Sequence, residues 1–236
     1  MEKLALVTGG AHPMGIGFAS AKALVKLGYE VIVTGISAEE IALTPKGANI
    51  SARVLDVTSD DDVAALISDL PRLDALVNCA GTASLGEFEI AGFQKTVDVN
   101  LTGTMRVSMA AYPLLAKQGG AIVNIGSMYS IFGSTMAPAY AASKGGVVAL
   151  TRSFAATWAK DGIRVNAVAP GWIKTNMARM LWEDEQQAAP ISERTPMGRW
   201  GDPQELGDVI GFLCAPESRF VTGVLIPVDG GYSISG

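Results

Sequence analysis

Short apolar runs alternate with segments of helical periodicity along almost the whole chain. The runs are rich in Val, Ile and Leu without polar alternation, as is typical of strands buried on both faces of a parallel sheet. This alternation predicts an α/β fold, with a doubly wound sheet of about seven mainly parallel strands and helices on both faces. The predicted strands are 4–8, 30–35, 51–57, 74–78, 121–125, 164–168 and 224–228, and the predicted helices are 16–27, 38–43, 60–69, 90–117, 139–160 and 203–214.

One segment departs from this alternation. Residues 173–200 contain no strand pattern, but they carry a Met/Leu/Trp-bearing stretch followed by an acidic run. A connection of that length inside a compact domain is usually functional or disordered. We therefore expect one domain over residues 1–236 with residues 173–200 as a substrate lid, and a solvated mobile excursion is the alternative.

The amino-acid composition argues against several classes of binding partner. A net charge of −5 and no cluster of Lys and Arg argue against a nucleic-acid partner. No apolar span or leader pattern appears, so we predict no membrane partner and a cytoplasmic location. The single histidine, His12, excludes a His-rich metal site, and no metal is expected. Cys79 and Cys214 lie in apolar runs and are interpreted as small buried residues.

A glycine-rich loop follows the first predicted strand and opens the first predicted helix. In that context Gly9 allows a tight turn, while Gly15 and Gly17 let the backbone approach a pyrophosphate. The helix that begins near Ile16 directs its free N–H groups at the phosphates. The pattern predicts a dinucleotide site, with His12, Met14 and Ile16 among its contacts.

The end of the second predicted strand bears on the choice between NAD and NADP. A carboxylate there favours NAD and an arginine favours NADP, but the sequence Gly35-Ile36-Ser37 has neither. Ser37 and Glu40 form a capping-box pattern, so Glu40 is expected to serve a helix start. Since no cation meets a 2′-phosphate, NAD is slightly favoured, with Ser37 as a contact. His12 would reverse that preference if it reached the 2′-phosphate.

Tyr140 and Lys144 are spaced i, i+4 on a predicted helix, so their side chains share one face. An ammonium about 4 Å from the phenol, at an effective dielectric of about 20, contributes roughly 4 kcal/mol. That predicts a Tyr140 pKa near 7, suited to a general acid–base catalyst. Ser127 follows a predicted strand at the carboxyl edge of the sheet, where it can hydrogen-bond a substrate oxygen. Together with the dinucleotide site, these residues indicate hydride transfer at a carbonyl or alcohol.

At this point the chain resembles the short-chain dehydrogenase/reductase family, of the Tyr-x-x-x-Lys type, over essentially all of its length. The likeness rests on several segments in family order. They are Asn78-Cys79-Ala80-Gly81, Asn100-Leu101-Thr102-Gly103, Ile122-Val123-Asn124-Ile125-Gly126-Ser127, Tyr140-Ala141-Ala142-Ser143-Lys144, Val165-Asn166-Ala167-Val168-Ala169-Pro170-Gly171 and Val228-Asp229-Gly230-Gly231.

The resemblance implies a Rossmann-like fold, an NAD(P)-dependent oxidoreductase and a homotetramer, with a dimer as the fallback. It implies that Asn100, Ser127, Tyr140 and Lys144 are catalytic. Asn100 would hold a water in a proton relay, and Lys144 would bind the nicotinamide ribose. The cofactor contacts that it implies are Asp56 and Val57 at the adenine, Asn78, Ala80, Gly81, Pro170 and Gly171 along the cleft, and Ile173 and Thr175 at the carboxamide.

Three departures from the family pattern stand out. Five residues, Gly10 to Met14, separate the glycines where most members have three. That spacing is similar to enoyl-acyl-carrier-protein reductases, whose tyrosine–lysine spacing is longer. Ile36 stands where many NADP-using members carry arginine. Thr82-Ala83-Ser84 after Gly81 is unlike 3-oxoacyl-carrier-protein reductases and demotes a role in fatty-acid synthesis.

The residues expected to face the substrate are mostly apolar and aromatic: Tyr129, Phe132, Trp172 and Met177, with Met180 and Trp182 in the lid. Arg179 is the one candidate cation, and a solvated surface arginine is the commoner interpretation. The set predicts a small, mostly uncharged ketone or secondary alcohol, including a polyol. Two alternatives stay open: a non-catalytic NAD(P)-binding redox-sensing regulator, and a reductase of C=C or C=N bonds.

Overall fold

The computed structural model of the protein describes residues 2–47, 49–83 and 86–235. Ser84, and the terminal residues 1 and 236 of the predicted domain, lie outside the described residues. In the described part the strands form one seven-stranded sheet, ordered β3-β2-β1-β4-β5-β6-β7, and every neighbouring pair is parallel. The strands are β1 (Lys3–Thr8), β2 (Tyr29–Gly35), β3 (Ile50–Val54), β4 (Ala75–Asn78), β5 (Ala121–Ile125), β6 (Arg164–Pro170) and β7 (Leu225–Val228). The doubly wound fold predicted from the sequence is confirmed.

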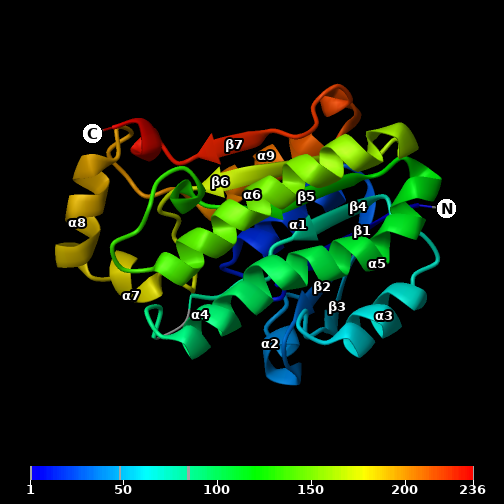
Figure 1. Ribbon diagram of the computed structural model, residues 1–236, viewed down its shortest axis with the longest axis horizontal. Helices are drawn as coiled ribbons and strands as arrows, with labels where there is room; N and C mark the ends of the chain where they lie inside the picture. Colours follow the sequence, from blue (N-terminus) through cyan, green and yellow to red (C-terminus); the bar gives the residue numbers. More distant parts are fainter. Residues whose placement is uncertain (1, 48, 84–85, 236) are drawn as a thin grey trace.

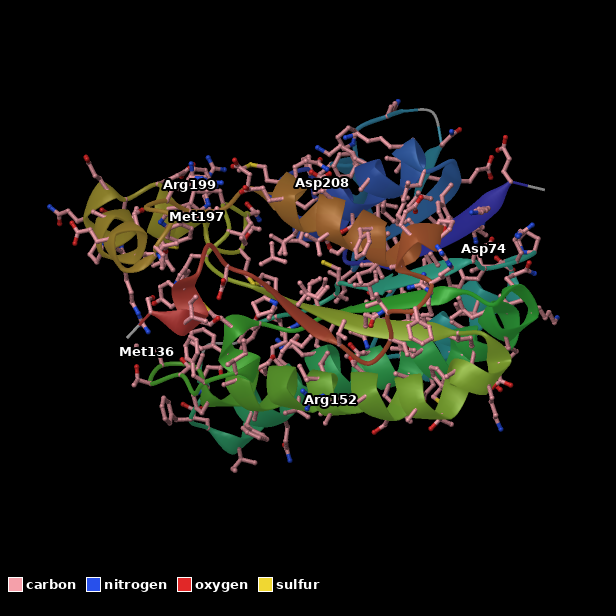
Figure 2. All side chains as sticks on the ribbon, turned by 90° about the horizontal axis from the view of Figure 1, so that it is seen from above. Asp74, Met136, Arg152, Met197, Arg199 and Asp208 are labelled. Carbon is pink, nitrogen blue, oxygen red and sulfur yellow. The ribbon has the colours of Figure 1, made fainter. Side chains whose placement is uncertain are left out.

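Helices cover both faces of the sheet (Figure 1). On one face lie α3 (Asp60–Ser68), α4 (Ile90–Val97), α5 (Gly103–Gln118) and α6 (Pro138–Trp158). On the other face lie α1 (Ile16–Lys26) and α9 (Pro203–Cys214), and the short α2 (Ala38–Ala42) stands beside β2 and β3. Figure 2 shows the sheet between these two helical layers.

The strands feed two separate apolar cores because successive side chains point to opposite faces. In β1, Leu4 and Leu6 pack into the core under α3, α5 and α6, whereas Ala5 and Val7 pack into the core under α1 and α9. The same alternation continues in β4 and β5. Both faces of the sheet are therefore sealed, which explains the continuous apolar runs in the sequence.

Small residues bring α9 close to α1. A Cβ atom placed on Gly207 would lie 2.6 Å from the carbonyl oxygen of Ala19, and one on Gly211 would lie 3.2 Å from the Cβ of Ala23. The absence of side chains at these glycines lets the two helices pack backbone to backbone. This contact fixes α1, whose first turn faces the glycine loop.

Two predicted elements differ from the structure. The predicted strand 51–57 ends at Val54, because the Asp56 carboxylate accepts hydrogen bonds from the N–H and the hydroxyl of Thr58 and turns the chain. The predicted helix 90–117 is broken by a π-helical segment, η1 (Asp98–Thr102), between α4 and α5. Such π-helical segments frequently mark functional sites, and this one contains Asn100.

The segment 173–200 contains two short helices, α7 (Arg179–Trp182) and α8 (Glu185–Arg194), and no strand within this fully described range. A single parallel bridge between Ile173 and Gly201 closes its base. Figure 1 shows the segment beyond the carboxyl ends of β6 and β7, next to the C-terminus. None of the described helices has the length and apolarity needed to cross a membrane.

Candidate active site

The glycine loop after β1 lies against the end of β4. Gly9 has φ +63°, and a Cβ there would lie 2.6 Å from the Cα of Ala80. The Thr8 hydroxyl holds the two strand ends together, because it accepts the N–H groups of Cys79 and Ala80, each at 3.1 Å. Gly9 therefore supplies both a left-handed backbone and a close approach that a side chain would prevent.

The N-terminus of α1 has the features of a phosphate site. Its N-cap is Gly15, which offers no side-chain acceptor, and the first N–H groups of a helix have no acceptor within the helix. A Cβ at Gly17 would lie 2.7 Å from the Cα of Gly10, so bare backbone lines the loop. His12 folds the longer loop, since its Nδ1 accepts the N–H of Met14 at 3.1 Å. These residues fit a pyrophosphate at this helix start.

At the predicted adenine end the side chains also serve local structure. The Ser37 hydroxyl caps α2 by accepting the N–H of Glu40 at 3.3 Å, and the Glu40 carboxylate accepts the N–H of Ile36 at 2.8 Å. The expectation that Glu40 serves the helix start is thus confirmed. Val57 is buried, and a Cβ at Gly103 would lie 2.8 Å from its Cγ2. Contacts of Ser37, Asp56 and Val57 with a cofactor stay predictions.

Tyr140 and Lys144 share one face of α6, as their spacing predicts. The Lys144 Nζ lies 5.5 Å from the centroid of the Tyr140 ring. Lys144 is buried, and its ammonium donates to the carbonyl oxygen of Ile125 at 2.8 Å, at the end of β5. The lysine is therefore fixed between α6 and the carboxyl edge of the sheet.

Ser127 comes directly after β5, and its side chain lies close enough to the Tyr140 phenol to lower the pKa of that phenol, against the larger effect of burial. Its own hydroxyl also caps η2 (Met128–Ser130) by accepting the N–H of Tyr129 at 3.2 Å. Ser130 completes the arrangement, because its hydroxyl accepts the Ser127 N–H and donates to the Lys144 carbonyl at 2.8 Å. One short turn thus ties the serine, the tyrosine and the lysine together.

The pKa values correct one expectation from the sequence. Burial raises the pKa of Tyr140 to about 12, although the Ser127 side chain acts in the opposite direction. Burial also lowers the pKa of Lys144 to about 8. The predicted Tyr140 pKa near 7 is therefore wrong for this structure, because burial of the phenol dominates its pKa. At neutral pH the phenol carries its proton.

Asn100 is fully buried in the π-helical segment η1. Its Oδ1 accepts the N–H of Thr82 at 2.8 Å, and its Nδ2 donates to the Thr82 carbonyl and, at 3.0 Å, to the hydroxyl of Ser143. Ser143 in turn donates to the carbonyl of Tyr140 at 2.7 Å. Asn100 is thus connected to α6, while a water relay through it stays a prediction.

Gly81 leaves space beside Asn100 and Lys144. A Cβ at Gly81 would lie 3.3 Å from the Oδ1 of Asn100 and 3.5 Å from the Nζ of Lys144. A glycine keeps that space open to a ligand, which fits the nicotinamide ribose expected there. Asn78, in contrast, turns its side chain inward and donates from Nδ2 to Ser108 and Asn124.

At the end of β6, which Pro170 closes, the Gly171 N–H donates to the carbonyl of Val228 in β7 at 3.1 Å. A Cβ at Gly171 would lie 2.6 Å from the Cβ of Asp229, so this close approach also requires glycine. Ile173 is buried, and the Thr175 N–H donates to the Ile173 carbonyl at 2.7 Å. The turn therefore presents residues 173–175 at the carboxyl edge of the sheet, where a carboxamide contact was predicted.

Aromatic rings extend outward from Tyr140. Tyr129 packs edge-on to Tyr140, with centroids 6.4 Å apart, and to Phe132 at 5.6 Å. Tyr232, which the sequence analysis missed, lies 6.4 Å from Phe132 and 6.5 Å from Trp172. We call Tyr129, Phe132, Trp172 and Tyr232 the aromatic wall. It brings together three of the four predicted substrate residues, whereas Met177 is 63% exposed on a lid turn.

Two cations of the lid differ in their partners. Arg179, the cation considered from the sequence, is exposed and paired with Glu183 at 2.7 Å. Arg194 lies over the Tyr232 ring at 4.3 Å and donates to the Tyr232 hydroxyl at 3.0 Å. It also lowers the pKa of Tyr129, against the larger effect of burial. Arg194, rather than Arg179, is therefore the cation next to the aromatic wall.

A separate cavity of about 480 Å³ lies between the turn after β6, β7 and the start of α9. Its lining includes Trp172, Arg199 and Asp229 but none of the four predicted catalytic residues. Figure 2 shows Arg199 and Met197 at the lid end of the molecule and Asp74 near the opposite end. This cavity is thus next to the site rather than at the reacting position.

Of the two cysteines expected to be buried, Cys214 is buried and Cys79 is half-buried, and both are free thiols. Burial raises the pKa of Cys214 to about 12 and that of Cys79 to about 11. In the described residues no group of His, Cys, Asp and Glu side chains could hold a metal ion.

Comparison with known proteins is consistent with this geometry. Residues 9–233 match a family model described as Enoyl-(Acyl carrier protein) reductase. The chain is 37% identical to cis-4-hydroxycyclohexanecarboxylate dehydrogenase of Sinomonas cyclohexanicum, over 98% of this chain and 97% of that protein. It is also 37% identical to 5-keto-D-gluconate 5-reductase of Escherichia coli, over 98% and 95% of the two chains.

A solved structure extends the likeness to the cofactor. The crystal structure of a gluconate 5-dehydrogenase from Burkholderia cenocepacia, in complex with NADP and tartrate, superposes with a TM-score of 0.91. The two sequences are 32% identical, and the match covers 99% of this chain and 96% of the other. The protein is an NAD(P)-dependent oxidoreductase acting on a secondary alcohol or ketone, and it belongs to the short-chain dehydrogenase/reductase family.

Proposed function

We propose that Tyr140 is the general acid–base catalyst and that Ser127 orients the reacting oxygen. The observation that carries this proposal is the position of the Ser127 hydroxyl beside the Tyr140 phenol, whose pKa it lowers, next to a buried Lys144. In ketone reduction the phenol donates its proton to the carbonyl oxygen, and in alcohol oxidation it takes that proton back. Since the phenol is protonated at neutral pH, the site is suited to reduction there.

The nicotinamide supplies the hydride in reduction and accepts it in oxidation. The residues suited to hold the cofactor are the glycine loop for the pyrophosphate, and Gly81, Lys144, Ile173 and Thr175 around the nicotinamide ribose and carboxamide. Lys144 has a second role as a positive charge beside the phenol. Asn100 holds Thr82 and Ser143, and through Ser143 it supports the backbone of Tyr140.

We propose a small, mostly uncharged ketone or secondary alcohol as substrate, bound against the aromatic wall. The test is a screen of cyclic ketones, cyclic alcohols and polyols, followed by nicotinamide absorbance with wild type and Tyr140→Phe. Turnover of at least one of them by wild type, and a large loss in the variant, is the expected result. Equal turnover by both proteins would contradict the role of Tyr140.

A hydroxy acid is the second candidate substrate, and Arg194 is the observation that favours it. Its guanidinium lies at the outer end of the aromatic wall, where a carboxylate remote from the reacting carbon can pair with it. The names of two relatives, a hydroxycyclohexanecarboxylate dehydrogenase and a ketogluconate reductase, denote substrates that are acids.

Paired substrates separate these two candidates. 4-Hydroxycyclohexanecarboxylate and its methyl ester share a ring and differ in charge. If the acid is the substrate class, Arg194→Gln lowers kcat/KM for the acid about tenfold and leaves the ester unchanged. Arg179→Gln, whose arginine already pairs with Glu183, is the matched control and has no effect on either. Equal kcat/KM for acid and ester in wild type would favour the uncharged class.

We propose NAD as the preferred cofactor. The Glu40 carboxylate lies on the Ile36 N–H at the end of β2, close to where a ribose 2′ substituent is bound in such folds. Its negative charge disfavours a 2′-phosphate. Fluorescence titration should therefore show tighter binding of NADH than NADPH, and Glu40→Gln should reduce the ratio of the two dissociation constants. Tighter binding of NADPH to wild type would refute this preference and direct attention to His12.

We also propose a domain organisation, a cellular location and an oligomeric state for the protein. Residues 1–236 act as one domain with 173–200 as the substrate lid, in a cytoplasmic homotetramer, with a dimer as the fallback. Exposed methionines on α5, Met105 and Met109, support an assembly, because they form an apolar strip on a helix that covers the sheet. Light scattering after size exclusion measures the subunit number.

A further inference from the structure

The catalytic helix α6 starts without a cap of its own. Its N-cap residue is Ala137, whose side chain accepts no hydrogen bond, although the first N–H groups of a helix need acceptors. One acceptor comes from far along the chain. The Oε2 of Glu87, 53 residues upstream, accepts the N–H of Tyr140 itself at 2.8 Å.

The carboxylate of Glu87 is held between two helices. The residue is only 8% exposed, and its Oε1 accepts a long hydrogen bond of 3.5 Å from the hydroxyl of Thr96, which is fully buried in α4. α4 packs against α6. Burying a charge is costly unless it is paired, and here the positive end of the α6 dipole and these donors compensate it.

An ordinary cap would be a simpler solution if the helix start were the only requirement. A Ser, Thr, Asp or Asn at position 137 would satisfy the same N–H group locally. Glu87 instead joins the segment before α4 to the residue that carries the reacting phenol.

The charge of Glu87 also acts on the phenol. The titratable groups that face Tyr140 are Lys144 on its own helix, Cys79 after β4, Tyr129 on η2 and Glu87 before α4. Beyond the larger effect of burial, the negative charge of Glu87 raises the pKa of Tyr140. The carboxylate therefore helps to keep the proton on the phenol.

We propose that Glu87 is a positioning residue for the reaction, anchoring the backbone of Tyr140 so that the phenol faces Ser127. This inference rests on the proposed role of Tyr140 as general acid–base. It assigns to the segment before α4 a function in proton transfer, in addition to its place at the edge of the cleft.

Three variants distinguish the effect of the Glu87 charge from the effect of its hydrogen bond to the Tyr140 N–H. Glu87→Gln keeps an oxygen that can accept the Tyr140 N–H but removes the charge. Glu87→Ala removes both. Glu89→Gln is the matched control, because Glu89 is an exposed carboxylate two residues away that makes no capping hydrogen bond.

Each variant is measured for kcat against pH in both directions, for the dissociation constant of NADH and for Tm. For Glu87→Gln we expect the alkaline limb of ketone reduction to move to lower pH, because the negative charge that raises the Tyr140 pKa is removed, with kcat at neutral pH near wild type. For Glu87→Ala we expect kcat to fall about 10- to 100-fold while NADH binding stays within about twofold, since a small misplacement of a catalytic group is costly. Glu89→Gln should match wild type.

An unchanged pH profile in Glu87→Gln together with an unchanged kcat in Glu87→Ala would overturn the proposal, even if Tm fell. If Glu87→Ala does not fold, the pH profile of Glu87→Gln alone tests the proposal, and an unchanged profile would overturn it. Tyr140→Phe separates this inference from the proposed function. Full activity in Tyr140→Phe would refute the role of the tyrosine, whereas a normal Glu87 series beside an inactive Tyr140→Phe would refute only the role of Glu87.

Discussion

The site around α6 and the lid 173–200 are built in opposite ways. Asn100, Ser127 and Lys144 are buried, and each makes hydrogen bonds to a neighbouring element. Most lid residues are exposed, and both lid helices are short. The proposed reacting groups are thus fixed by the sheet edge and by α6, while the proposed substrate lid is mostly exposed.

Backbone pairs attach the segment 173–200 to the rest of the molecule: the Lys174 N–H donates to the Gly201 carbonyl at 2.9 Å, and the Met197 N–H donates to the Gly230 carbonyl at 3.1 Å. The Trp182 Nε1 donates to the Thr175 carbonyl at 2.9 Å, and the Trp200 Nε1 donates to the Ala188 carbonyl at 3.2 Å. Both indole bonds lie within residues 173–200, so they fold this segment on itself and leave its attachment to the backbone pairs. From this difference we expect substitutions near α6 to change the rate of the chemical step, and substitutions in residues 173–200 to change substrate choice.

The largest contrast is expected between Ser127→Ala and Met177→Ala. Loss of one hydrogen-bond donor at a reacting oxygen lowers kcat about 10²- to 10³-fold. Met177 is exposed on the lid, so its truncation should change kcat/KM less than about fivefold. Steady-state kinetics on one substrate measures both, and similar losses in kcat would remove the distinction between the two regions.

The pH dependence of stability tests the burial of Lys144. Its folded pKa of about 8 lies below its ordinary 10.5, so the unfolded chain binds more protons between these values. Stability therefore rises as pH increases through this window, by about 3 kcal/mol in full.

Lys144→Met lacks this group and serves as the comparison. Urea unfolding at pH 7, 8, 9 and 10 should show wild type gaining stability relative to the variant. Cys79 and Tyr140, whose pKa values are raised, lose stability at alkaline pH in both proteins. If the unfolding free energies of the two proteins changed in parallel with pH, a buried Lys144 with a lowered pKa would be contradicted.

Two glycines with positive φ allow the backbone of the glycine loop to be compared with the backbone of residues 173–200. Gly9 in the cleft has φ +63° and Gly198 in the lid has φ +67°, so alanine is strained at both. Only at Gly9 would the new Cβ collide, at 2.6 Å from the Cα of Ala80; nothing lies within 4 Å at Gly198. We expect Gly9→Ala to cost about 1–3 kcal/mol more in unfolding free energy than Gly198→Ala. Equal costs would show that the cleft backbone yields as readily as the lid.

The smallest effect is expected for Trp182→Phe, which removes the indole donor to Thr175 and keeps an aromatic ring. A single partly buried hydrogen bond contributes about 1 kcal/mol, so KM should rise about fivefold at most while kcat stays near wild type. Limited proteolysis within 183–188 should become faster. A loss of kcat comparable with that of Ser127→Ala would mean that the lid takes part in the chemical step.

Much of the fold was predictable because burial on both faces of a parallel sheet leaves a strong apolar signal. The boundary of β3 was missed, since a turn formed by the Asp56 carboxylate competes with strand propensity. The break between α4 and α5 was also missed. It depends on packing of η1 against α6, which no local pattern reveals.

At the site, spacing alone predicted that Tyr140 and Lys144 share a face and that Ser127 lies at the strand end. The pKa direction was missed, because desolvation depends on the surrounding fold rather than on the pair. The capping serine Ser130 has a signal in its spacing of three from Ser127. Glu87 and Tyr232 have none, since their partners lie 53 and 38 residues away.

The most direct test of the account is single-turnover reduction of a screened ketone by wild type and Tyr140→Phe, each saturated with NADH. We expect both proteins to bind NADH with similar dissociation constants. Wild type should consume it in one fast phase, and the variant should be about 10²- to 10⁴-fold slower. An equal fast phase in Tyr140→Phe would contradict the central claim that this phenol moves the proton.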